Sequence, residues 1–363
     1  MISGRAVRPL LRFSKPLLSF FILTIFLFAS TADAEEDRLK IGFIGSFSGP
    51  GSAWGAACRN GFELGLEEIS RPFTVIYEDD QLVLSKTVSA FNKLVERDGV
   101  NLIVVLSSGP SMAIAPLAEK RKVPLLAWAS NEKVSLGRRY VLRTWPSAER
   151  EAAVMAAEAA QRGYDKLGFI ISINDFTQAI ARGFRSQYKL APLLIDEEYP
   201  PETQDFRPFL LKASAKGVKQ LGTCLSFGQS GMIAKQAKEL SLNLELFGCE
   251  SFEDSEEHRI AAGALNGAWY VSAQSNHSFA QKYQTRFGTS NLLTAAGSHY
   301  DLAHLLLRKN LTGKMSAEQI MQALLSPLKV SGALGEFQVV SVNGDNYIDF
   351  SMGVSIINKK DSD

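Results

Sequence analysis

The sequence predicts an α/β protein divided into two lobes, each built around a mainly parallel sheet. Short apolar runs of strand length alternate with longer segments of helical periodicity, which is the pattern of βαβ units. The alternation begins near residue 39 and begins again after residue 140. The 363 residues, 46% hydrophobic and 21% charged, also suffice for two domains at about 100–200 residues each.

The first half of the chain begins with an apolar strand at 39–45 and a Gly/Ser loop at 46–52. A helix follows, because Ala57, Gly61 and Leu64 share one helical face. The elements expected after it are strands at 73–77, 102–106 and 123–127 and helices at 85–97 and 111–120.

The second half begins with an extended segment at 140–145 that ends at Pro146, and we expect the chain to cross between lobes near Thr144. An alanine-rich helix follows at 147–162, with Ser147 as its N-cap. The elements expected next are strands at 167–171, 192–197, 220–226, 244–248 and 269–273 and helices at 178–188, 206–216 and 231–240.

The last part of the chain predicts helices at 278–286 and 294–308 and a third that begins at Ser316 with a capping-box pattern. These helices have no strands of their own, so they must pack on an existing sheet. The tail is a hairpin candidate, because Asn343-Gly344-Asp345 separates two β-rich runs at 336–342 and 347–357.

Residues 1–34 have the features of a secretory signal peptide. Four basic residues precede an apolar run at 17–28, and Ala32-Asp33-Ala34 matches a cleavage site. The alternative is an uncleaved anchor helix, although the apolar run is short for a membrane span. Cleavage would remove four basic residues and one acidic residue, which changes the formal net charge from +1 to −2. We therefore expect a mature protein of 329 residues in the periplasm.

Several function classes find little support in the sequence. Near-neutral charge lacks the electrostatic footprint of a nucleic-acid binder. The dinucleotide, P-loop and G-x-S-x-G patterns are missing, so we expect no cofactor and no catalytic residues. The four histidines are scattered and do not favour a metal site. A secreted α/β hydrolase is an alternative function, but it requires a nucleophile–base pair that these histidines do not provide. The chain has three cysteines, Cys58, Cys224 and Cys249. They permit either one disulfide bridge, for which Cys224 and Cys249 could lie close enough, or three buried thiols.

Chemistry-bearing residues gather where the predicted strands end, and ligands of parallel α/β sheets bind at that edge. Hydroxyl groups at helix starts suit an anion, an acid suits an ammonium group, and aromatic rings suit an apolar side chain. Together they predict a site for an α-amino acid or similar zwitterion. The alternatives are serines that only cap helices, tryptophans that only pack, and an acidic run at 250–257 that is only solvated. The candidate ligand-binding residues are Trp54, Ser107, Ser108, Trp128, Ala129 and Ser130 in lobe one and Phe176, Phe227 and Glu250 in lobe two.

Several stretches, in their order and spacing, resemble the type I periplasmic solute-binding proteins of ABC importers, in the Leu/Ile/Val-binding protein branch. The resemblance covers residues 38 to about 358. The stretches that carry it are 41–49 with Trp54-Gly55, 77–80, 107–109 with Ala115-Pro116, 123–124 leading to 129–131, Tyr300-Asp301 and Gly344-Asp345.

The resemblance implies two Rossmann-like lobes joined by three crossover strands, with the ligand cleft between them. It also implies that the late helices rejoin lobe one and that the tail joins lobe two. The expected boundaries are therefore 35–144 plus 275–335 for lobe one and 145–274 plus 336–363 for lobe two.

The resemblance further implies a monomer that captures a small molecule by hinge closure and delivers it to an ABC permease in the inner membrane. Ser108 and Ser130 would hold the ligand carboxylate, Glu250 its amino group, and Trp54, Phe176 and Phe227 its side chain. Bulky Trp128 and Phe176 depart from the family pattern and argue against branched-chain amino acids. A sensor or docking subunit of the same fold, binding an amide or an aromatic acid, is the alternative.

Overall fold

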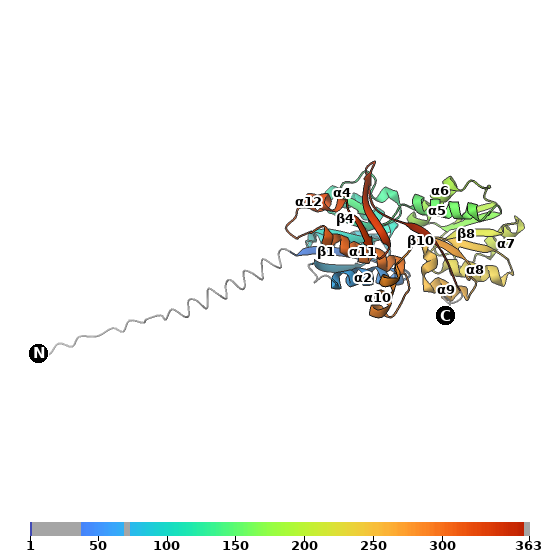
Figure 1. Ribbon diagram of the computed structural model, residues 1–363, viewed down its shortest axis with the longest axis horizontal. Coiled ribbons are helices and arrows are strands. Elements are labelled where there is room, and N and C mark those ends of the chain that lie inside the picture. The colour runs from blue at the N-terminus through green and yellow to red at the C-terminus, as the bar shows by residue number, and fades with distance from the viewer. Residues whose placement is uncertain (2–37, 69–72, 359–363) are drawn as a thin grey trace.

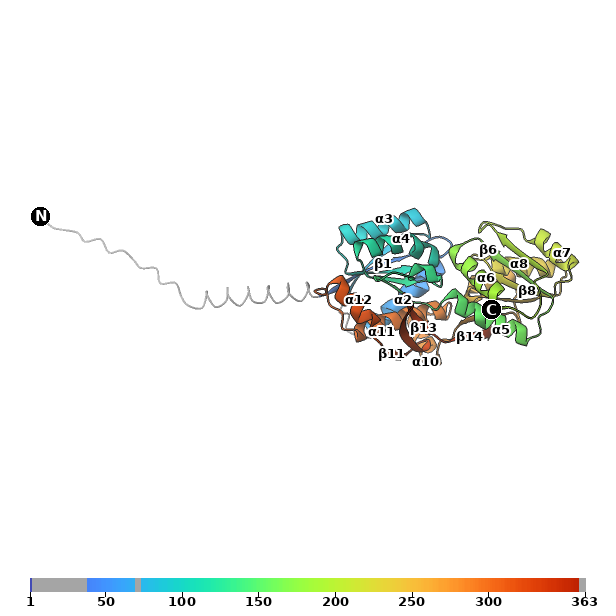
Figure 2. The same ribbon diagram turned by 90° about the horizontal axis from the view of Figure 1, so that it is seen from above.

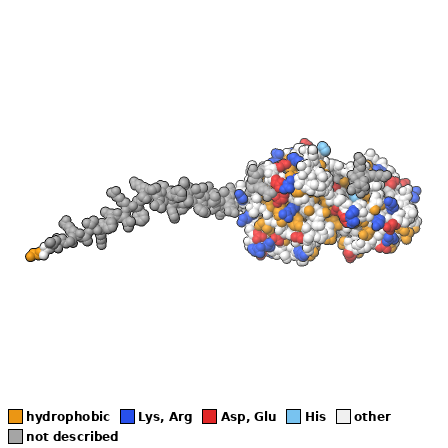
Figure 3. Space-filling model, turned by 90° about the horizontal axis from the view of Figure 1, so that it is seen from below, with side chains coloured by type: hydrophobic (Ala, Val, Ile, Leu, Met, Phe, Trp, Pro, Cys, Tyr) orange, Lys and Arg blue, Asp and Glu red, His pale blue; other side chains and the backbone are white. Residues whose placement is uncertain are grey.

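The computed structural model describes residues 1, 38–68 and 73–358, and these residues form two α/β lobes side by side (Figures 1 and 2). The predicted signal peptide lies outside the described residues except for residue 1. Within the described ranges, no helix is both long enough and apolar enough to cross a membrane. Basic and acidic side chains are interspersed over the face shown in Figure 3.

Lobe one is built on an eight-stranded sheet in the order β11-β12-β13-β5-β4-β3-β1-β2. The β11–β12 and β12–β13 pairs are antiparallel and all other neighbours are parallel. Its strands are β1 (Leu39–Gly45), β2 (Phe73–Asp79), β3 (Leu102–Leu106), β4 (Leu125–Trp128), β5 (Val141–Arg143), β11 (Lys329–Gly332), β12 (Gly335–Val342) and β13 (Asp345–Phe350). Its helices are α2 (Ser52–Glu67), α3 (Leu84–Glu96), α4 (Ser108–Arg121), η1 (Glu132–Val134), α10 (His277–Phe287), α11 (Leu293–Arg308) and α12 (Ala317–Leu325).

Lobe two is built on a six-stranded sheet in the order β14-β10-β9-β8-β6-β7, parallel except for the edge pair β10–β14. Its strands are β6 (Leu167–Ser172), β7 (Ile195–Tyr199), β8 (Gln220–Cys224), β9 (Glu245–Gly248), β10 (Trp269–Ala273) and β14 (Met352–Ile356). Its helices are α5 (Ala148–Gln161), α6 (Asp175–Gln187), α7 (Arg207–Ala215), α8 (Gln229–Glu239), η2 (Glu250–Glu253) and α9 (Ser255–Ala261).

Helices cover both faces of each sheet because successive strand residues point to opposite faces. In β1, Ile41 and Phe43 join the core beneath α2, α10, α11 and α12, whereas Ile44 joins the core beneath α3 and α4. In β6, Phe169 and Ile171 pack with α5 and α6, whereas Ile170 packs with α7 and α8. The near-continuous apolar runs that predicted these strands are therefore explained by burial on two faces.

The chain passes between the two sheets three times: between β5 and β6, between β10 and β11, and between β13 and β14. The predicted two-lobe α/β fold with three crossovers is confirmed. The expected Asn343-Gly344 turn also forms, with φ of 52° and 79° and direct pairing of Val342 with Asp345.

The assignment of 336–363 to lobe two is wrong for residues 336–350. The strands β12 and β13 pair within the first sheet, and β13 lies beside β5. Only β14, which follows Ser351, pairs in the second sheet, antiparallel to β10. The tail is thus a hairpin of lobe one plus one edge strand of lobe two, and residues near Ser351 form the third crossing.

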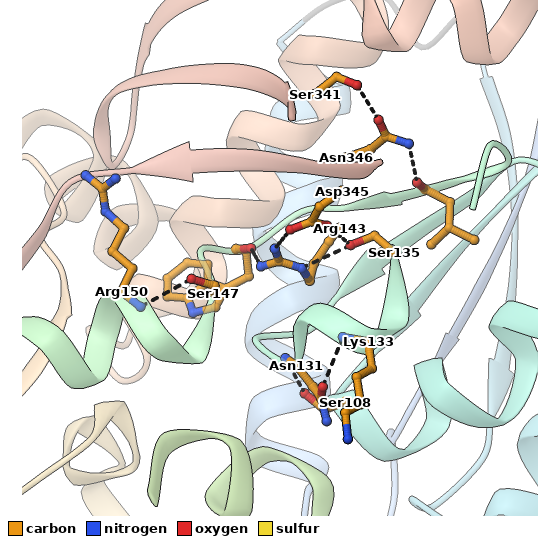
Figure 4. Close-up of polar contacts among 12 residues, drawn as sticks. Ser108, Asn131, Lys133, Ser135, Arg143, Ser147, Arg150, Ser341, Asp345 and Asn346 are labelled. Carbon is orange, nitrogen blue, oxygen red and sulfur yellow. Dashed lines mark hydrogen bonds and ion pairs between the residues drawn. The ribbon is translucent and has the colours of Figure 1, made fainter. Parts of the chain in front are cut away.

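A buried arginine joins the first crossing to the strand that leads into the third. Arg143, the last residue of β5, is 0% exposed, and its guanidinium lies 2.8 Å from the Asp345 carboxylate. It also donates to the carbonyl oxygen of Trp145 at 2.8 Å and to the hydroxyl of Ser135 at 3.3 Å (Figure 4). Because Asp345 begins β13, this network ties the end of β5, where the first crossing begins, to the strand that leads into the third.

Candidate functional site

Two serine loops of lobe one lie next to each other at the ends of β3 and β4. Ser108 is the buried first residue of α4, and its hydroxyl accepts a long hydrogen bond from the backbone N–H of Asn131 at 3.4 Å. Figure 4 shows these two residues together. Ser107 has φ of 72° and ψ of 148°, a conformation that is costly for any residue other than glycine. Such strain is typical of functional sites, and no sequence pattern predicted it.

The second serine loop contacts lobe two directly. The carbonyl oxygen of Ser130 accepts the backbone N–H of Ala148, the first residue of α5, at 2.8 Å. The side-chain amide of Asn131 donates to the carbonyl oxygen of Asp175, the first residue of α6, at 3.3 Å. Ala129 and Ser130 are buried. The loop after β4 therefore lies against the N-terminal ends of two helices of the other lobe.

A cluster of aromatic rings fills the junction beside these loops. The Trp128 ring lies 6.0 Å from Trp54, 5.6 Å from Trp145 and 5.5 Å from His299, measured between centroids. The Trp54 indole donates across the junction to the carboxylate of Asp254 at 2.9 Å. Trp145 and His299 were not among the predicted site residues, although Trp145 stands at the predicted crossing.

His299 is held as a neutral imidazole. Its Nδ1 lies 2.9 Å from the carbonyl oxygen of Ala295, so Nδ1 carries the proton and donates. Burial lowers the pKa of His299 to about 4, and the backbone hydrogen bond opposes that change. The Nε2 atom is therefore a buried acceptor, and no donor reaches it from the described residues.

Lobe two contributes a pair of buried carboxyl groups. Glu250 follows β9 and is 5% exposed, and Glu151 in the first turn of α5 is 1% exposed. A carboxylate oxygen of each, together with Sγ of Cys249, lies within 4.8 Å of the others. Burial raises the pKa of Glu151 well above its usual range, and the charge of Glu250 raises it further. Burial also raises the pKa of Glu250. The sequence predicted Glu250 but not Glu151.

The structure decides between one disulfide bridge and three buried thiols. Cys224 and Cys249, at the ends of β8 and β9, form a disulfide with 5.8 Å between their Cα atoms. Cys58 is a buried free thiol. The bridge ties the end of β9, from which the Glu250 segment departs, to the end of the neighbouring strand β8. Because the Cys249 sulfur is bonded to Cys224, it is not a thiolate, and the group around it is a carboxyl pair rather than a metal site.

The two phenylalanines differ in their surroundings. Phe176 is half-buried in the first turn of α6, one residue after the Asp175 carbonyl that Asn131 contacts. Phe227 is 40% exposed just before α8. The structure therefore brings Trp54, Ser108, Trp128 and Ser130 into or beside the junction through named contacts. Glu250 is buried next to Glu151 in lobe two, and Phe227 takes part in none of these contacts.

A family model described as periplasmic binding protein matches residues 38–351. The Leu/Ile/Val-binding protein BraC3 of Rhizobium johnstonii is 23% identical over 261 residues, which cover 68% of this chain and 70% of that protein. Two solved structures share the fold. The first, the branched-chain amino acid transporter substrate binding protein LivJ from Streptococcus pneumoniae in complex with isoleucine, has a TM-score of 0.76 at 20% identity and covers 87% of this chain and 100% of that one.

The second is a solute binding protein of an ABC transporter from R. palustris in complex with 4-hydroxybenzoate. Its TM-score is 0.80 at 19% identity, and the match covers 90% of this chain and 94% of that one. The family model includes residues of both lobes and ends at Ser351, where the third crossing lies. The chain belongs to the periplasmic binding protein family, as a type I member related to the Leu/Ile/Val-binding proteins.

Proposed function

We propose that this protein captures an amino acid or a related small zwitterion in the periplasm and delivers it to the inner-membrane permease of an ABC importer. The ligand is held between the lobes, which close over it. Trp54, the serine loops of Ser108 and Ser130, and Glu250 form the contact surface, with Phe176 at its edge. The proposal rests on the family and on the chemistry of the junction.

The observation that carries the proposal is a set of buried polar atoms whose hydrogen bonds are incomplete. Near the serine loops, the indole N–H groups of Trp128 and Trp145 are donors without an acceptor among the described residues. In lobe two, both carboxylate oxygens of Glu151 and Oε2 of Glu250 are acceptors without a donor there. Since buried polar groups are normally paired, the junction is suited to a molecule that carries both an anionic acceptor and a cationic donor.

Lobe closure follows from contacts that exist only when the lobes meet. Trp54 to Asp254 and Asn131 to Asp175 are both such contacts. The three crossing segments are the covalent connections between the lobes, so motion concentrates there. A ligand that bridges the lobes shifts the equilibrium toward closure by its differential affinity for the closed form.

A second candidate ligand is an aromatic carboxylic acid without an amino group. The clustered rings of Trp54, Trp128 and Trp145 favour it, and the R. palustris protein with a similar fold holds 4-hydroxybenzoate. The buried carboxyls of Glu151 and Glu250 disfavour it, because an anion placed near them is repelled.

The test is thermal stabilisation of the purified mature protein by a panel of amino acids, amides and aromatic acids, followed by calorimetric titration. We expect an α-amino acid to stabilise the protein by about 2.7 kcal/mol at 100 times its dissociation constant. Ser130→Ala and Glu250→Ala should weaken that binding, and Glu149→Ala, at an exposed site on α5, should not. Stabilisation only by acids without an amine would favour the second candidate, and no stabilisation by any small molecule would refute both.

A further inference from the structure

The Glu151–Glu250 pair is a feature that the family resemblance did not suggest. The two residues come from different elements, the first turn of α5 and the start of η2, and both belong to lobe two. Their carboxyl groups are within 4.8 Å of each other and almost fully removed from water. Two ionised carboxylates at this separation repel strongly in a medium of low dielectric constant.

The neighbouring charges do not relieve this repulsion. No basic side chain of the described residues acts on either carboxyl group. The strands β10 and β14, which pack on α5, carry no Asp, Glu, Lys, Arg or His. The other ionisable residue on η2 is also an acid, Glu253. The basic groups on α5 and α6 act on acids elsewhere: Arg150 on Asp349, Arg162 on Glu158, Arg185 on Asp196 and Glu198, and Arg182 on Glu198.

In the absence of a ligand, one proton shared between the two carboxyl groups would remove this repulsion. As carboxylates, both oxygens of Glu151 and Oε2 of Glu250 have no hydrogen bond of good geometry among the described residues, and only the backbone N–H of Glu250 lies near enough to lower the pKa of Glu151. When Glu151 is protonated, its hydroxyl can donate to Glu250, and one negative charge remains. The positive N-terminal end of α5 favours an ionised Glu151, whereas burial and the charge of Glu250 raise its pKa well above the usual range.

We propose that Glu151 and Glu250 act together as the cation-binding half of the ligand site, and that an ammonium-bearing ligand displaces the proton they share. An ammonium group has three N–H donors and one positive charge, which matches two carboxylates with unpaired oxygens. The proton balance is complete: the ligand enters as R–NH3⁺, both carboxyls become ionised, and one proton leaves to solvent. The inference rests on the proposed function and decides against its second candidate ligand, an aromatic acid without an amino group.

The test uses probe pairs that differ only in the amino group: L-isoleucine with 3-methylpentanoate, and L-phenylalanine with 3-phenylpropionate. Titration calorimetry at pH 7 in two buffers of different ionisation enthalpy gives both the affinity and the number of protons released. In each pair we expect the amine to bind about 10- to 100-fold more tightly, since hydrogen bonds to charged groups have that effect, and to release close to one proton. Equal or tighter binding of the deaminated probe would overturn the inference and leave the proposed function standing, whereas binding by none of the four would count against both.

Two variants separate the roles of the carboxyls. Glu151→Gln removes the shared proton, so the amine should bind without proton release and more weakly. Glu250→Gln should weaken the amine and leave the deaminated probe unchanged or bound more tightly. Glu149→Gln, the same change on the exposed face of the same helix, is the matched control and should behave as wild type. Full proton release in Glu151→Gln would overturn the inference.

A ligand-free measurement covers the case in which a variant folds poorly. Infrared spectra of the wild-type protein at neutral pH should contain a band from a protonated carboxyl group that disappears in Glu151→Gln and persists in Glu149→Gln. Circular dichroism of each variant reports whether it is folded. A wild-type spectrum without such a band would overturn the shared proton and with it the proposed displacement.

Discussion

Removing the charge of Asp345 tests whether the buried ion pair at the crossings stabilises lobe one. Asp345→Asn keeps the size of the side chain and leaves Arg143, which is 0% exposed, without its anionic partner. Breaking a buried pair in this way costs about 3–5 kcal/mol. The side chain of Asp345 is 18% exposed, and asparagine keeps one acceptor oxygen, so we expect the low end of that range, about 3 kcal/mol.

The assay is differential scanning calorimetry of protein from which bound ligand has been stripped by unfolding and refolding. A loss of about 3 kcal/mol corresponds to a decrease of about 6–12 °C in the melting temperature of the transition that includes lobe one. Asp349→Asn is the matched control, because Asp349 lies on the same strand and pairs with Arg150 at 2.9 Å. Since the Arg150 side chain is 46% exposed, that pair contributes at most about 1 kcal/mol. Equal shifts in the two variants would refute the reasoning.

Three further predictions concern other parts of the molecule. Trp54→Phe removes the hydrogen bond to Asp254, so we expect the equilibrium constant for lobe closure to fall about 10- to 100-fold, measured by small-angle scattering and ligand affinity. Burial raises the pKa of Glu253 from 4.5 to about 7, so the folded protein binds more protons than the unfolded chain in that window. Stability should therefore fall as pH rises from about 4.5 to 7, and Glu253→Gln should flatten that fall in calorimetry. Gly61→Ala places a Cβ 1.9 Å from the carbonyl oxygen of Ala296, which should cost about 1–3 kcal/mol or more in thermal unfolding.

Two of these predictions have a control variant in the chain. Gly109→Ala places its Cβ no closer than 3.6 Å to any neighbour and should not destabilise the fold. Glu256→Gln changes an exposed acid near Glu253 and should leave the steep part of the pH profile in place. An unchanged scattering profile in Trp54→Phe would mean that the indole hydrogen bond does not hold the lobes together.

Lobe one shows how much of the site follows from the sequence. The serine loops were predicted to meet because parallel strands end at one edge of a sheet, and the backbone N–H of Asn131 does reach the Ser108 hydroxyl. Hydrophobic periodicity placed β3 and β4, and the loops follow from where those strands end. The strain at Ser107 could not be predicted, because φ of 72° is imposed by the fold on a residue that does not favour it.

The tail shows where sequence patterns stop being informative. Asn343-Gly344 specifies a tight turn locally, and the turn forms. The same β-rich pattern continues through residue 357, yet β13 and β14 pair in different sheets on either side of Ser351. Strand propensity does not encode the pairing partner, which depends on the edges that the rest of each sheet leaves open.

Glu151 was missed because its sequence context has a sufficient local explanation. Glu149 and Glu151 stand in the first turn of an alanine-rich helix, where acidic residues are favoured by the helix dipole whether or not they have another role. The proximity of Glu151 to Glu250, ninety-nine positions later, is produced by the packing of both α5 and η2 against β10. Only the burial of its side chain separates it from Glu149.

The carboxyl pair and the lobe contact are therefore separable parts of the site. Glu151 and Glu250 both belong to lobe two, so opening the lobes leaves their separation unchanged. Closure by itself does not displace the proton that we propose they share, whereas an ammonium group bound between them would. The Trp54 to Asp254 hydrogen bond, in contrast, joins the lobes and is lost on opening. Trp54→Phe should thus weaken binding of every ligand by a similar factor, whereas Glu151→Gln should act only on ligands with a cationic nitrogen. Weakening of both probe classes to the same extent by Glu151→Gln would place that residue in closure rather than in recognition.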